Sequence, residues 1–143
     1  MSKVLKRFED FIENVNLIND EILDKSIGAW SVRDVISHLT NWDRYSLDVM
    51  VPLMEDGARL PEWVDHDKHN QIAVKKAAEY VNADSLKQDF RDTRLELVKA
   101  LMNLNPELRF TIGKGKRTYS IDSYTKIFVH HDEHHMKQIQ EIM

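Results

Sequence analysis

Cysteine is absent from the 143-residue sequence. The chain therefore forms no disulfide bond, offers no thiolate to a metal and has no cysteine nucleophile. Any metal site must use imidazole and carboxylate groups. This favours zinc or nickel, with iron or manganese as alternatives, over cluster chemistry.

Long apolar runs and an excess of basic charge are also missing. No stretch approaches about 18 consecutive apolar residues, and no basic segment followed by an apolar one marks a signal peptide. We therefore expect a cytoplasmic protein without a membrane span. The formal net charge is −4 and the basic residues are scattered, which argues against nucleic acid as a partner.

Glycine and proline are scarce, with 4 and 3 residues respectively. The segments between them carry apolar residues at steps of three and four, the period of an amphipathic α-helix. With 42% hydrophobic residues, the composition suits one domain over residues 1–143 with a core of its own. We predict an all-α fold, a four-helix bundle with a long connection between its second and third helices.

Helix starts are marked by capping residues. Ser31 followed by Asp34 is a capping pattern, with Trp30 before it as a staple residue. The other expected caps are Asp84 or Ser85 and Ser120 or Asp122. We expect helices over residues 3–19, 32–50, 68–80 and 85–104, and a last helix that carries the histidines. Pro52 is expected to end or kink the second of them.

One segment departs from the helical pattern. Between Arg109 and Ser120, β-prone residues flank a Gly-rich turn, which predicts a short hairpin or extended loop. It is the only place where we expect strand pairing.

In the helix expected over residues 85–104, the residues expected to face inward are Leu86, Phe90, Leu95, Leu97, Val98 and Leu101.

Four of the seven histidines lie between His130 and His135. On a helix, His131 and His135 share one face, and His130 and His134 share the adjacent one. An i,i+4 pair can aim two ring nitrogens at one cation but needs a third ligand from elsewhere. His38 is the candidate, because two helices of an antiparallel bundle can place it opposite the pair. Taken alone, a histidine at position 38 would more often be a core residue with satisfied hydrogen bonds or a partly exposed one.

The remaining polar residues near these histidines have ordinary interpretations. His130 and His134 could be solvated, packed or hydrogen-bonded to the ligands. Asp132 and Glu133 fit a solvated helical face, and His66 and His69 fit surface polar positions.

Two segments and the crossover between them together resemble a known family. The segments are Trp30-Ser31-Val32-Arg33-Asp34-Val35-Ile36-Ser37-His38-Leu39 and His131-Asp132-Glu133-His134-His135-Met136-Lys137-Gln138-Ile139. They resemble the DinB-like (YfiT-like) superfamily of metal-dependent enzymes, which are four-helix bundles. The resemblance implies that His38, His131 and His135 hold a divalent metal with open coordination positions, and that the protein is a homodimer. Trp63 and Tyr80 would suit such an interface.

The resemblance also implies a small-molecule substrate and leaves several functions open. Our first functional prediction is a transferase in which the metal activates a low-molecular-weight thiol, such as bacillithiol or mycothiol, for attack on a small electrophile. The first alternative is a hydrolase that activates water. A narrower likeness to the ClbS/DfsB branch, seen in Trp42 and in residues 63–70, implies a protective hydrolase. The second alternative is a dimeric bundle that binds metal or ligand without turnover.

Site residues beyond the metal ligands are predicted from the same likeness. It places Trp42 and Asn70 in the pocket, although they could instead be a core aromatic and an N-terminal cap. The general base stays open among Asn41, Asp43, Tyr45, Asn70 and His134.

Overall fold

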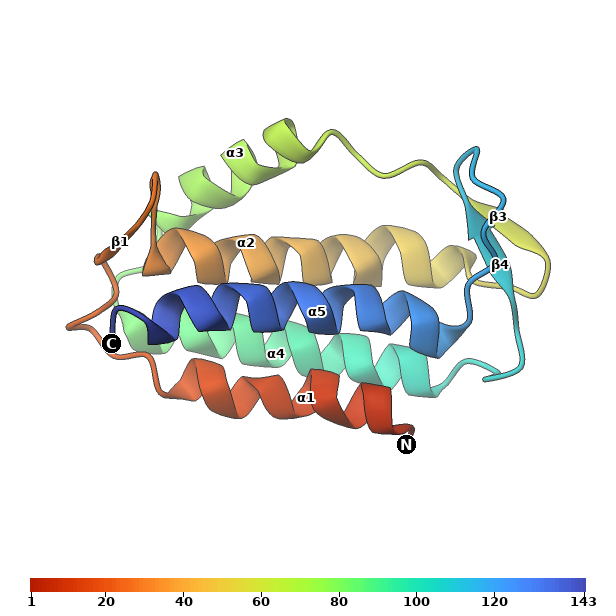
Figure 1. Ribbon diagram of the computed structural model, residues 1–143, viewed down its shortest axis with the longest axis horizontal. Helices are drawn as coiled ribbons and strands as arrows, with labels where there is room; N and C mark the ends of the chain where they lie inside the picture. Colours follow the sequence, from red (N-terminus) through yellow and green to blue (C-terminus); the bar gives the residue numbers. More distant parts are fainter.

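Four long helices form a bundle in the computed structural model, which describes residues 1–143 (Figure 1). They are α1 (Lys3–Asn16), α2 (Val32–Tyr45), α4 (Ala83–Met102) and α5 (Ile121–Gln140). A shorter helix, α3 (His66–Ala77), lies over α2. The predicted all-α, four-helix bundle is confirmed, as is the long connection between α2 and α3. None of these helices combines the length and the apolar character that crossing a membrane requires.

Hydrogen-bonding side chains fix where the bundle helices begin. The side chain of Ser31 accepts a hydrogen bond from the backbone N–H of Asp34, and Asp34 accepts one in return from the backbone N–H of Ser31. Ser120 caps α5 in the same way. The cap expected for α4 was wrong, because Asn82 caps it and Ser85 completes the box three residues later. An asparagine oxygen accepts the free N–H groups of the first turn as well as a serine does.

Helix α2 changes its winding before it ends. Its α-helical part stops at Tyr45, and the chain continues as a π turn over Ser46–Met50 and a 3₁₀ turn over Val51–Leu53. Pro52 lies in the 3₁₀ turn. A proline has no N–H to donate and its ring crowds the carbonyl four residues earlier, which explains why regular α-helix cannot continue to residue 53.

Strand pairing is more extensive than the sequence predicted. Strand β1 (Ser26–Ile27) pairs antiparallel with β2 (Trp30–Ser31), and β3 (Ala58–Leu60) pairs in parallel with β4 (Phe110–Ile112). Within the segment predicted as a hairpin, only the bridge between Phe110 and Tyr119 is antiparallel. The expectation that residues 109–120 would hold the only strand pairing was therefore wrong. The main partner of β4 is β3, which is distant in sequence.

A buried ion pair network joins the four helices of the bundle. Arg94 on α4 is fully buried, with its Nε 2.7 Å from Asp43 Oδ2 on α2 and its Nη1 2.9 Å from Asp132 Oδ2 on α5. The same Nη1 donates to the backbone carbonyl of Phe8 on α1 at 2.8 Å. Although burial opposes the charged form, the two carboxylates raise the pKa of Arg94 above its ordinary value.

This network corrects two predictions. Asp132 was expected on a solvated face, but only 2% of it is exposed. Leu95 was expected to face inward, but it is 38% exposed and the neighbouring Arg94 takes the interior position. A guanidinium that is hydrogen-bonded to two carboxylates can occupy a core position that hydrophobic patterning assigns to leucine.

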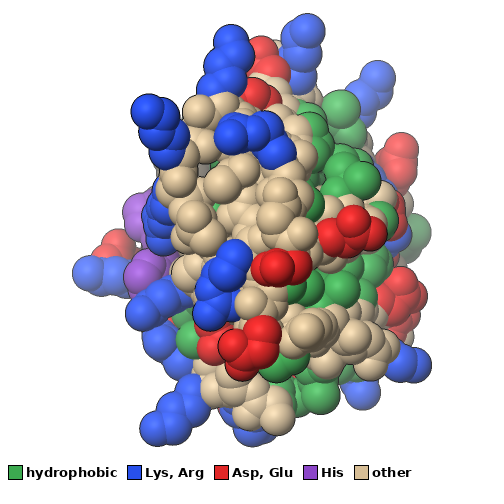
Figure 2. Space-filling model, turned by 90° about the vertical axis from the view of Figure 1, so that its right-hand side faces the viewer, with side chains coloured by type: hydrophobic (Ala, Val, Ile, Leu, Met, Phe, Trp, Pro, Cys, Tyr) green, Lys and Arg blue, Asp and Glu red, His purple; other side chains and the backbone are tan.

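The end of the molecule that carries β3 and β4 is charged but of mixed sign. Figure 2 shows basic side chains around its rim and acidic ones between them. Histidine side chains reach the surface at one edge of this view, which is the side of the bundle turned toward the viewer in Figure 1.

Candidate metal centre

His38 lies on the part of α2 that faces both α3 and α5. Its side chain is 5% exposed. The rings of Trp30 and His38 are 5.0 Å apart, so the residue that precedes the α2 cap covers one side of the imidazole. Ser37 Oγ donates to the Ala73 carbonyl at 2.7 Å and Asn41 Nδ2 donates to the His69 carbonyl at 3.2 Å, which holds α3 against α2 on either side of His38.

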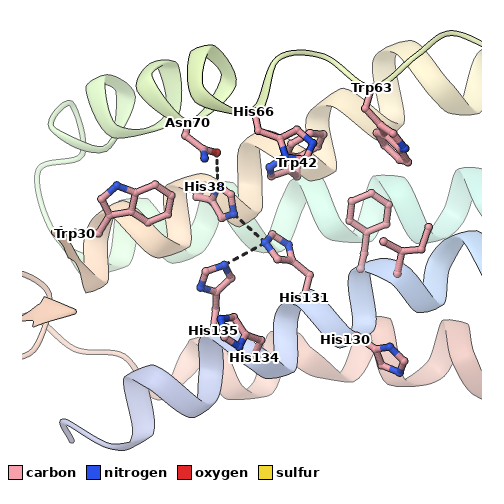
Figure 3. Close-up of a pocket in the computed structure, with 12 residues that line it drawn as sticks. Trp30, His38, Trp42, Trp63, His66, Asn70, His130, His131, His134 and His135 are labelled. Carbon is pink, nitrogen blue, oxygen red and sulfur yellow. Dashed lines mark hydrogen bonds between the residues drawn. The ribbon is translucent and has the colours of Figure 1, made fainter. Parts of the chain in front are cut away.

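His131 and His135 project from successive turns of α5 toward His38, as Figure 3 shows. His131 Nε2 is 2.9 Å from His38 Nε2 and 3.1 Å from His135 Nε2. One nitrogen from each of the three rings lies within 4.8 Å of the others. The structure therefore brings together the three histidines that the sequence singled out.

Two amides determine which ring nitrogens carry the protons. His38 Nδ1 lies 2.9 Å from Asn70 Oδ1, and His135 Nδ1 lies 2.9 Å from Gln138 Oε1. An amide oxygen only accepts, so both rings carry their proton on Nδ1 and turn the lone pair of Nε2 toward His131.

This proton arrangement tests whether the cluster suits a metal. His131 Nε2 faces two lone pairs and has at most one proton to donate, so protein hydrogen bonds alone cannot satisfy both contacts. A divalent cation accepts all three lone pairs at once. Outer hydrogen bonds that fix the tautomer are also typical of histidine ligands. The donor set therefore fits a divalent metal of the kind that imidazole prefers.

The three imidazoles are neutral near pH 7. Burial, helped by the neighbouring histidines, lowers the pKa of His38 to about 3 and that of His131 to about 4. Burial also lowers the pKa of His135. Neutral rings are the form that binds a metal, so the site does not have to lose protons before a cation enters.

A pocket of about 710 Å³ opens beside the three histidines. Trp42 on α2 and Asn70 on α3 both line it, and Trp42 is also a buried member of the apolar core. Asn70 is not an N-terminal cap, because Asp65 caps α3. Trp63, which the sequence suggested for an interface, lines the pocket as well.

The candidates for a general base are separated by the structure. Asp43 is buried and engaged by Arg94, so it is withdrawn as a candidate. Asn41 is bonded to the backbone of α3, and Tyr45 packs against Trp42 with ring centroids 5.7 Å apart. His134 lines the pocket next to His135.

Several residues of the site were missed or undervalued from the sequence. His66 is exposed, as expected of a surface position, and it also lines the pocket from the first turn of α3. His69 is half-buried and packs on Trp42 with ring centroids 4.2 Å apart. Gln138 was not singled out at all. Its position three residues after His135 on a helix was the available signal, since such a pair shares a face.

Comparison with known proteins supports both the family and the fold. The sequence matches the DinB superfamily over residues 2–139. Its structure is similar to that of YfiT from Bacillus subtilis, described as "a probable metal-dependent hydrolase with an unusual four-helix bundle topology". The TM-score is 0.73 at 17% sequence identity, and the match covers 99% of this chain and 87% of that one. No curated protein matches the sequence.

Proposed function

Because the chain belongs to the DinB superfamily, we propose that it is a metal-dependent hydrolase whose divalent cation is held by His38, His131 and His135. The observation that carries this proposal is the convergence of three neutral imidazoles, two of which, His38 and His135, have their outer nitrogens bonded to amide oxygens. Zinc or nickel suits this donor set best, and iron or manganese is also compatible with it.

A divalent cation held by three imidazoles keeps open coordination positions, at which it can acidify water and polarise a carbonyl group. The chain's own residues bind and orient the substrate around that point. His66 on α3 and His134 on α5 line the same pocket and can accept the proton that water releases. His38 is buried and His131 is half-buried, so both rings are positioned by the surrounding side chains at the inner side of the pocket.

Thiol transfer, our first prediction from the sequence, becomes the second candidate. The chain has no cysteine, so a thiol would have to enter as a cosubstrate. The pocket volume of about 710 Å³ lies within the range of roughly 300–1,000 Å³ typical of small-molecule sites and leaves room for a small thiol beside an electrophile. We rank hydrolysis first because water needs no binding site of its own.

Metal content tests the site before any reaction is assumed. Protein purified without a histidine tag and loaded with zinc or nickel should retain about one ion per chain through gel filtration. His131→Ala should lose the ion and keep its helical circular dichroism, because His131 is not part of the apolar core. His130→Ala is the matched control and should keep the ion, since its ring is exposed and directed away from the cluster (Figure 3).

Activity assays then separate the candidate functions. The loaded protein should hydrolyse an ester, amide or epoxide without added thiol, and His131→Ala should not. Turnover that requires a low-molecular-weight thiol and consumes it would establish the transferase. If the loaded protein binds its metal but shows neither hydrolysis nor thiol transfer, the protein is instead a bundle that binds metal or ligand without turnover.

A further inference from the structure

The pocket beside the three histidines contains no fixed charge. Its twelve lining residues are three tryptophans, one phenylalanine, one isoleucine, one asparagine and six histidines. No aspartate, glutamate, lysine or arginine faces it, although such residues make up 31% of the chain. A phosphate, carboxylate or ammonium group would have to leave water without an ion pair partner, which is costly. The pocket therefore disfavours a charged group away from the metal.

Aromatic rings are concentrated at one end of this pocket. Trp63 lies 6.0 Å from Trp42 and 6.0 Å from Phe128, at interplanar angles of 72° and 63°. Trp63 also stacks on the buried ring of Tyr124 at an angle of 15°, which limits its movement. Trp42, Trp63 and Phe128 thus form a continuous surface of ring faces and edges, named here the aromatic wall.

The aromatic wall and the three histidines lie next to each other. Figure 3 shows Trp63 at one end of the pocket and Trp30 at the other, with His38, His131 and His135 between them. Trp30 packs on His38, and the aromatic wall lines the other end of the same pocket, where Trp63 is its most exposed ring. A molecule with its reacting group at the histidines would extend its remaining part along the wall.

We propose that the substrate is an uncharged compound with an aromatic ring, bound with the ring on the aromatic wall and a carboxylic ester or amide at the histidines. This inference rests on the proposed hydrolase function. In the reaction the oxygen of water bonds to the acyl carbon, and the bond from that carbon to the ester oxygen or amide nitrogen breaks. The leaving group takes up one proton of the water, and the acid releases the other.

Ring contacts give the wall its preference for flat aromatic groups. Offset and edge-to-face contacts add about 0.5–1.5 kcal/mol per pair beyond the area buried, which corresponds to roughly a 2- to 12-fold gain in affinity. A saturated ring of the same size buries similar area but gains nothing from the ring quadrupoles. An added carboxylate loses its hydration and finds no cation in the lining.

Binding of ketones that cannot be hydrolysed tests the inference independently of catalysis. The probes are methyl 2-naphthyl ketone, its saturated decalinyl counterpart and the naphthyl ketone with a carboxylate on the far ring. Titration calorimetry on the zinc-loaded protein should show the naphthyl ketone binding at least about 5-fold tighter than either of the other two.

Two substitutions locate the effect. Trp63→Leu should reduce binding of the naphthyl ketone to the level of the saturated one and leave zinc content unchanged. Phe128→Leu is a second test of the same wall should Trp63→Leu fail to fold. Tyr119→Leu is the matched control, because it removes an aromatic ring that stacks on Phe110 outside the pocket. It should bind the naphthyl ketone as the unmodified protein does.

The possible results separate the two proposals. Equal binding of the three ketones, or tightest binding of the carboxylate, overturns the inference about the substrate. A naphthyl preference that depends on Trp63, found in a protein that does not hydrolyse 2-naphthyl acetate, supports the aromatic wall and overturns the hydrolase function. Hydrolysis of naphthyl and decalinyl acetates with the same KM supports the hydrolase and overturns the aromatic wall.

Discussion

Replacing Arg94 with methionine should strongly destabilise the protein. The substitution removes five hydrogen bonds, four of them to the carboxylates of Asp43 and Asp132. Both carboxylates are 2% exposed and would be left without a cation. Breaking a buried ion pair by removing one partner costs about 3–5 kcal/mol. We expect a loss of about 4 kcal/mol and a fall in Tm of about 12 °C.

Urea denaturation followed by circular dichroism measures this loss. The variant Arg94→Met, Asp43→Asn, Asp132→Asn is the control, because it removes the charges together and should recover at least half of the lost free energy of unfolding. The single variant should also come closer to the unmodified protein as the pH falls from 7 to 5. Burial raises the pKa of an unpaired carboxyl, so its penalty grows as pH rises through that pKa. A loss below about 1 kcal/mol, or a control less stable than Arg94→Met, would refute the reasoning.

Three further results are expected. Because the pKa values of His38 and His131 are lowered, these residues bind protons below about pH 6.5 in the unfolded chain but not in the folded one. The free energy of unfolding of the metal-free protein, measured by urea titration, should therefore fall progressively from about pH 6.5 toward pH 4. Asn70→Ala should weaken zinc binding roughly 10- to 100-fold in competition with a chelator, because His38 loses the acceptor that fixes its tautomer; unchanged affinity would contradict this. Gly113→Ala should lower the free energy of unfolding by about 1–2 kcal/mol in thermal unfolding, because the φ of Gly113 is 59° and the Glu62 side chain occupies the space that a Cβ would need. Gly115 has no positive φ, so Gly115→Ala should lower it by less than half as much.

The parts of the fold that depend on local sequence were predicted well. The Ser31 and Asp34 capping box, the helical periodicity and the scarcity of glycine were enough for the bundle. The pairing of β3 with β4 was missed because it joins residues about fifty positions apart and leaves no local pattern. The π turn after Tyr45 was missed because Pro52 predicts an interruption but not its form.

In the candidate site, too, the features that depend on local sequence were predicted and those that depend on distant contacts were not. Helical spacing alone places His131 and His135 on one face, and the three-histidine cluster contains both. The burial of Asp132 between them in sequence could not be predicted, since a charged residue on a helix reads as solvated unless its partner is known. That partner, Arg94, lies 38 residues away on another helix. The surface position of His66 was predicted, but its place at the pocket was not, because only the packing of α3 on α2 brings it there.

The hydrogen bond from His38 to Asn70 has a consequence for the motion of α3. This helix is held mainly through α2, and one of its bonds ends on a histidine of the cluster. Any opening of α3 away from the bundle would break that hydrogen bond and lower the affinity of His38 for a cation. By thermodynamic linkage, a bound cation must resist the opening by the same free energy. Amide hydrogen exchange in α3 should therefore slow when zinc is added, so that the exchange rate of this short helix indicates whether the metal is bound.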